Sequence, residues 1–138
     1  MIGLVLVTHG RLAEEMLSTL RTVLGSLEQI EAVSTGVEED PDVVGMKIRR
    51  AVERADRGEG SLILTDMLGD TATNLSLAIS RERQAEVVAG VNMPMLVKAV
   101  TCRQEMTLQA LADFIQGYGR DHIFWVSRGG KPARSSHG

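Results

Sequence analysis

Two kinds of apolar pattern alternate along the chain. Short runs of aliphatic and β-branched residues are typical of strands buried on both faces, whereas longer segments with an apolar residue at every third or fourth position are typical of amphipathic helices. The expected strands cover residues 2–9, 30–33, 61–65, 85–89 and 123–126. The expected helices cover residues 12–24, 41–57, 71–80, 94–101 and 107–118, and an acidic connector over residues 36–40 leads into the second of them.

This alternation predicts an α/β fold in which helices cover both faces of a doubly wound sheet of four parallel strands. In the flavodoxin-like strand order 2-1-3-4 the first and third strands are neighbours, and ligands bind beyond their carboxyl ends. We expect a single domain over residues 1–127. The polar segment over residues 128–138, RGGKPARSSHG, is predicted to be a disordered tail.

A histidine and an aspartate end the two strands that this order makes neighbours. His9 ends the first strand and Asp66 follows the third. A carboxylate that accepts one ring N–H of a histidine fixes the tautomer and leaves the other nitrogen with a free lone pair. Such a nitrogen can act as a nucleophile or a base. The alternative is purely structural: His9 would be a loop histidine and Asp66 an N-cap.

The helix after the third strand is expected to begin within Gly69, Asp70 and Thr71. Its first N–H groups and the positive end of its dipole favour an anion. A nucleophilic nitrogen beside an anion site suits the capture of a phosphoryl group. Because the sequence has neither GxxxxGK[ST] nor GxGxxG, we expect the donor to be another protein rather than a nucleotide.

Charge and composition exclude several classes of partner. The net charge of −3 argues against binding to nucleic acid or to an anionic membrane surface. Cys102 is the only cysteine, and the histidines lack the spacing of a metal site, so we expect no disulfide, metal or cofactor. The sequence has no apolar run of membrane-spanning length and no signal-peptide pattern, so we expect a cytoplasmic protein.

Three motifs resemble the IIA component of the mannose/fructose/sorbose-type sugar phosphotransferase system. They are VTHG at residues 7–10, LTDMLGDTATN at residues 64–74 and AGVNMPML at residues 89–96. The resemblance covers about residues 1–120. It implies four parallel strands and a fifth, antiparallel strand near the C-terminus that is exchanged within a homodimer. Residues 123–126 would be that strand in this chain.

The resemblance also implies roles and partners. His9 would carry the phosphoryl group on Nε2, and Asp66 would hold the N–H at Nδ1. The phosphocarrier HPr would be the donor and a IIB component the acceptor. A membrane permease would take part only indirectly, because the IIB component passes the phosphoryl group to the entering sugar.

One motif departs from the family pattern. The family reads D-x-x-G-G-S-P-x-N after the third strand, whereas this chain has Asp70 in place of the second glycine, Thr71 in place of serine and Ala72 in place of proline. Thr71 supplies the same hydroxyl group as serine. Asp70 would either repel an incoming phosphoryl group or cap the helix and point away.

We therefore predict a phosphotransferase that works as a phosphohistidine carrier. Three alternatives remain at this point. The first is a regulatory phosphoprotein of the same fold, and the second is a flavodoxin-like module that binds a small molecule at the same sheet edge. The third is a phosphotransfer subunit of a dihydroxyacetone kinase, which is normally longer than this chain.

Overall fold

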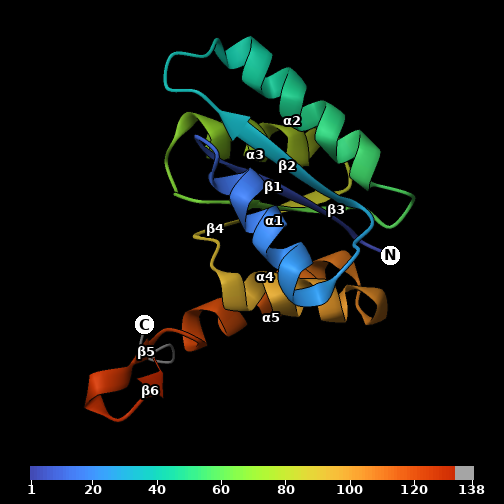
Figure 1. Cartoon of the computed structure of the whole chain (residues 1–138). Coiled ribbons are helices and arrows are strands. Elements are labelled where there is room, and N and C mark those ends of the chain that lie inside the picture. Colours follow the sequence, from blue (N-terminus) through green and yellow to red (C-terminus); the bar gives the residue numbers. More distant parts are fainter. Residues whose placement is uncertain (133–138) are drawn as a thin grey trace.

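The computed structural model describes residues 1–132 and shows a four-stranded parallel sheet between helices (Figure 1). The strand order is β2-β1-β3-β4, so the predicted fold class and order 2-1-3-4 are confirmed. In chain order the elements are β1 Gly3–His9, α1 Leu12–Leu24, β2 Ile30–Thr35, α2 Pro41–Ala55, β3 Ser61–Thr65, α3 Thr71–Glu82, β4 Ala85–Ala89, α4 Met93–Cys102, the 3-10 turn Arg103–Glu105, α5 Leu108–Asp121, β5 Phe124–Trp125, the 3-10 turn Val126–Arg128, and β6 Lys131–Pro132.

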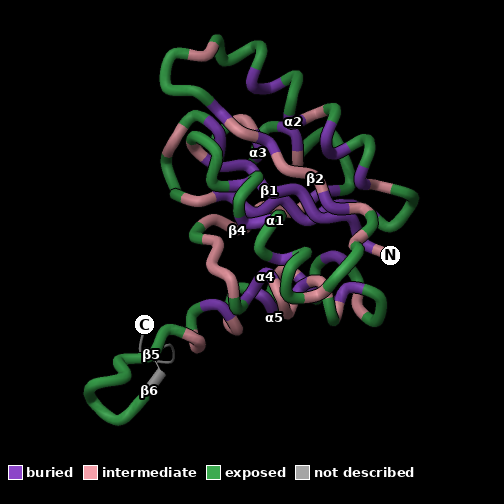
Figure 2. Tube along the Cα trace, in the orientation of Figure 1, coloured by how far each residue is buried: buried purple, intermediate pink, exposed green. Residues whose placement is uncertain are grey.

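The sheet separates two apolar layers. Leu4 and Leu6 of β1 pack on one face with residues of α1, α4 and α5, whereas Val5 and Val7 pack on the other face with residues of α2 and α3. Successive side chains of a strand point to opposite faces, so a run of apolar residues supplies both layers. Figure 2 shows buried residues along the central strands and exposed residues over positions 123–130.

Polar side chains set several helix ends. Asp40 caps α2, where its carboxylate accepts from the N–H of Asp42 at 2.8 Å, and Pro41 is the first helical residue, as the sequence predicts. The same helix ends at Ala55, two residues before its predicted end, because Asp56 is extended and its carboxylate binds the N–H groups of Gly58 and Gly60.

The C-terminal segment differs from its prediction. The expected strand over residues 123–126 is shorter, at Phe124–Trp125, and pairs antiparallel with Lys131–Pro132 of the same chain. Gly129 and Gly130 both have positive φ, which allows the tight return. Residues 128–132, predicted to begin a disordered tail, thus lie in this hairpin, and the remainder, 133–138, lies outside the described residues.

Candidate functional site

The site lies at the carboxyl ends of β1 and β3. His9 is the last residue of β1, and Asp66 is the first residue after β3. Val7 of β1 lies opposite Thr65 of β3 in the register, so both strands end at the same sheet edge. The turn into α1 is fixed by the hydroxyl group of Thr8, which accepts from the N–H of Ala13 at 2.6 Å.

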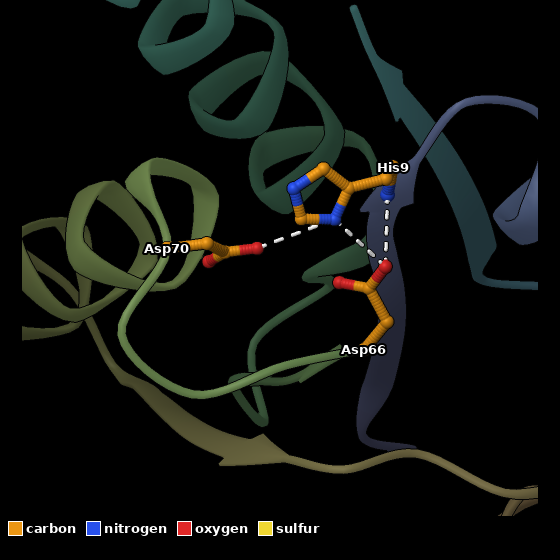
Figure 3. Close-up of side chains that lie close together, drawn as sticks. All are labelled: His9, Asp66 and Asp70. Carbon is orange, nitrogen blue, oxygen red and sulfur yellow. Dashed lines mark hydrogen bonds and ion pairs between the residues drawn. The ribbon is translucent and has the colours of Figure 1, made fainter. Parts of the chain in front are cut away.

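His9 and Asp66 are in direct contact (Figure 3). The His9 Nδ1 atom lies 2.9 Å from Asp66 Oδ2, and the main-chain N–H of His9 donates to the same oxygen at 3.0 Å. The other oxygen, Oδ1, accepts from the N–H of Met67 at 3.0 Å. Because a carboxylate only accepts, we infer that Nδ1 carries the proton and that Nε2 has the free lone pair. The predicted meeting of these two side chains is therefore confirmed.

The electrostatics of this pair shift the pKa values of both side chains. The hydrogen bond to Asp66 raises the pKa of His9; burial opposes this effect, and the negative charges of Asp66 and Asp70 add to it. Burial acts to raise the pKa of Asp66, but the hydrogen bonds from the main chain and ring of His9 outweigh it, so the pKa of this carboxyl is lowered. The imidazole is 41% exposed, so one side of the ring remains accessible to a partner.

Asp70 combines one part of each alternative from the sequence, because it caps α3 and also lies close to His9. Its Oδ1 atom caps α3 by accepting from the N–H of Thr73 at 2.6 Å. Its Oδ2 atom lies 3.4 Å from His9 Nδ1, as Figure 3 shows, and this buried oxygen has no hydrogen-bond partner among the described residues. The expectation that a capping Asp70 would point away is wrong, because a carboxylate has two oxygens and the second one faces the ring.

A cleft of about 830 Å³ opens beside His9. Gly69, Asp70 and Thr71 line one side of it, so the structure brings the predicted anion-binding residues to the histidine. The opposite side is the connector between β2 and α2, including Glu38, for which no sequence motif predicts a functional role. Its position could have indicated a role in the site, because the connector follows the carboxyl end of β2, which is adjacent to β1.

Hydrogen bonds hold His9 and Asp66 within a cluster of three polar side chains. Ligand atoms of His9, Asp66 and Asp70 lie within 4.8 Å of one another, a spacing that a cation would need. However, Nδ1 and both oxygens of Asp66 already have partners, so we interpret the cluster as a hydrogen-bonded histidine and not as a metal centre. Within residues 1–132, no helix is long and apolar enough to span a membrane.

Comparison with known proteins identifies the family. The family model described as PTS system fructose IIA component matches residues 3–116. The chain belongs to this family. The IIA component is 31% identical over 105 residues to the PTS system mannose-specific EIIAB component of Escherichia coli (strain K12), covering 75% of this chain and 32% of that protein. It is 28% identical over 124 residues to YadI of the same organism, described as a candidate phosphotransferase enzyme IIA component, covering 89% and 85% of the two chains.

Solved structures share the fold. A phosphotransferase system component EIIA from Streptococcus agalactiae superimposes with a TM-score of 0.85 at 28% identity, covering 93% of this chain and 99% of that one. A mannose/sorbose specific IIA subunit from Enterococcus faecalis gives a TM-score of 0.79 at 27% identity, covering 88% and 92%. These findings confirm the resemblance to the mannose/fructose/sorbose-type IIA components and place the chain in a sugar phosphotransferase system.

Proposed function

We propose that this IIA component accepts a phosphoryl group on Nε2 of His9 from HPr and passes it to a IIB component. The observation that carries this proposal is the hydrogen bond between His9 Nδ1 and Asp66, which leaves Nε2 as the nucleophilic nitrogen. His9 also lines an open cleft at the sheet edge, where a protein donor can approach. The whole exchange takes place in the cytoplasm under this proposal.

The transfer is an in-line displacement at phosphorus. The lone pair of Nε2 forms the new N–P bond, and the bond between phosphorus and the donor's nitrogen breaks, with its electron pair returning to the donor. The ring of His9 then carries Nδ1–H, the phosphoryl group on Nε2 and a formal positive charge. Asp66 orients the ring and stabilises this charge through the 2.9 Å hydrogen bond.

Main-chain N–H groups near the start of α3 are the proposed ligands of the phosphoryl oxygens. Gly69 and Thr71 line the cleft beside His9, and the positive end of the α3 dipole lies at the same place. The N–H of Thr73 is already bound by Asp70, so the N–H groups of residues 69–72 remain for this role. The carboxylate of Asp70 is an acceptor only and does not bind phosphoryl oxygens itself.

Both the donor HPr and the acceptor IIB component would dock around the cleft. Leu68 is 85% exposed and follows Asp66 by two residues, and Val37 is exposed on the opposite connector. Val37 and the acidic side chain of Glu38 line the cleft beside His9 and give it a mixed apolar and negative rim. Such a rim suits a partner that presents apolar side chains and positive charge near its own phosphorylated residue.

Intact mass after incubation with a phosphoenolpyruvate-driven HPr system tests the proposal. We expect one acid-labile phosphate on the wild type and none on His9→Gln. The matched control is His122→Gln, because His122 lies after α5 with its Nδ1 on the carbonyl of Tyr118, and this variant should take up phosphate as the wild type does. Phosphate retained on His9→Gln would contradict the assignment.

A homodimer is the second part of the proposal. The C-terminal hairpin exposes a continuous apolar segment, with Ile123, Trp125 and Val126 each more than half exposed. Among residues 1–132, no strand pairs with the outer side of β2 or β4, the two edge strands of the main sheet. In the proposed homodimer, the apolar segment of one copy covers an edge strand of the other copy.

A further inference from the structure

Asp70 presents a second carboxylate to the ring of His9. We propose that Asp70 is a positioning residue that keeps Nδ1 protonated while the phosphoryl group is on Nε2, so that the group leaves more readily. This inference rests on the proposed phosphorylation of His9. Asp70 Oδ2 lies 3.4 Å from Nδ1, and the Asp70 side chain is only 14% exposed.

Capping of α3 does not by itself explain an aspartate at this position. Capping uses Oδ1 alone, and neutral residues do the same in this chain: Asn92 caps α4 and Thr107 caps α5. A charged cap leaves Oδ2 buried without a hydrogen-bond donor among the described residues, which costs free energy. A positive charge on the ring of His9 compensates that cost, so the free energies of the two groups are linked.

The ease with which the phosphoryl group leaves Nε2 depends on whether Nδ1 carries a proton. When an acceptor attacks the phosphorus, the bond between Nε2 and phosphorus breaks and its electron pair returns to Nε2. With a proton on Nδ1 the departing group is a neutral imidazole; without that proton it is an imidazolate anion, which leaves far less readily. Carboxylates that face Nδ1 favour the protonated ring, so Asp70 and Asp66 act in the same direction.

Asp66 and Asp70 are the two carboxylates, among the described residues, with an oxygen within 4.0 Å of a ring nitrogen of His9. The remaining charges around the ring come from the turn before α1 and from the connector before α2. Arg11 is exposed and paired with two glutamates of α1, and Glu39 is paired with Lys47. The others are exposed and screened by solvent; they are Glu38 and Asp40.

The lifetime of the phosphohistidine tests this role. Wild type, Asp70→Asn and Asp70→Ser are phosphorylated with phosphoramidate, a small donor that needs no docking surface, and phosphate loss is followed between pH 5 and 9. Both replacements can still cap α3 but lack the charge. We expect phosphate loss to slow by roughly two- to fivefold, the size for a partly solvated ion pair, and its pH profile to move to lower pH.

The control and the possible results separate this inference from the proposed function. Asp56→Asn removes the same charge near the amino end of β3, at the opposite end of the strand from the site. Asp56 there binds two loop N–H groups, and this variant should leave the lifetime unchanged. Wild-type lifetimes in both Asp70 variants, or shorter ones, would overturn the inference while phosphorylation of His9 stands. A wild type that takes no phosphate on His9 would overturn both.

Discussion

One oxygen of Asp66 accepts from both the main chain and the ring of His9, so the backbone and side chain of the histidine are fixed by the same group. This arrangement fixes the direction of Nε2 before any partner arrives. Preorganisation of this kind reduces the entropy lost when the reacting atoms meet. The exposed fraction of the ring, 41%, leaves room for the donor on the side away from Asp66.

A pH series on His9→Gln tests the charge state of this pair. The pKa of His9 is raised above 6.5, so the stabilisation from its charged form is fully present below pH 6.5 and is lost as the pH rises through the higher pKa of the folded state. We expect the free energy of unfolding of the wild type, relative to His9→Gln, to fall over that interval in urea titrations. A difference that is constant across it would contradict the assigned contact.

The sequence was sufficient to bring His9 and Asp66 together, because the carboxyl ends of neighbouring parallel strands must lie at one edge. It was not sufficient for Asp70. Which way its second oxygen points depends on the side-chain rotamer that capping imposes on an extended residue, and this is a property of the folded turn. The distance of 3.4 Å to His9 Nδ1 could only be found from coordinates.

At the scale of elements, the position of β1 depends on close packing against α2. Gly3 lies at the start of β1, and a Cβ atom at this position would meet the carbonyl oxygen of Ala55 and lie 2.7 Å from its Cβ. The end of α2 therefore lies closer to the strand than it could if Gly3 were any residue with a side chain. This contact anchors the strand whose other end carries His9.

Two glycine substitutions are expected to change the free energy of unfolding in opposite directions. Gly3→Ala should lower the free energy of unfolding by about 1–3 kcal/mol, because the backbone of α2 must shift. Gly45→Ala, inside α2, meets only Leu75 at 3.8 Å and should raise it by about 0.5–1 kcal/mol through helix propensity. Thermal or urea unfolding measures both; a Gly3→Ala chain as stable as the wild type would rule out the close contact.

The helices and the strands of five or more residues were predicted well, and the two-residue strands of the hairpin were not. The helix that begins after Asp40 has a recognisable capping residue and proline, and both are found in place. The hairpin of Phe124–Trp125 and Lys131–Pro132 has two residues in each strand, so no periodicity can develop. Its second strand falls in a polar segment that composition alone assigns to a tail.

For the whole molecule, the cleft at the sheet edge and the C-terminal hairpin are two separate exposed features. Figure 1 shows the hairpin extending beyond α5, away from the four-stranded sheet. The aromatic residues at its base are packed, with the His122 ring stacked on Tyr118 at 3.7 Å between centroids. The apolar residues of its first strand, Phe124 and Trp125, are exposed, which fits contact with a second copy of the chain.

Removal of residues 122–138 tests this contact. If the hairpin joins two copies, the full chain should be a dimer in light scattering and the shortened chain a monomer or an aggregate. The double variant Phe124→Ser/Trp125→Ser keeps the chain length and should also weaken the dimer, because it removes two exposed apolar side chains. An unchanged dimer in both variants would show that copies meet elsewhere.

The most direct test of the central claim is to locate the phosphoryl group by phosphorus and nitrogen NMR on the phosphorylated, ¹⁵N-histidine-labelled chain. The hydrogen bond between Nδ1 and Asp66 leaves Nε2 as the nucleophile. We therefore expect a phosphorus–nitrogen coupling to Nε2 of His9 and a proton retained on Nδ1. A phosphoryl group on Nδ1, or on any residue other than His9, would contradict the account.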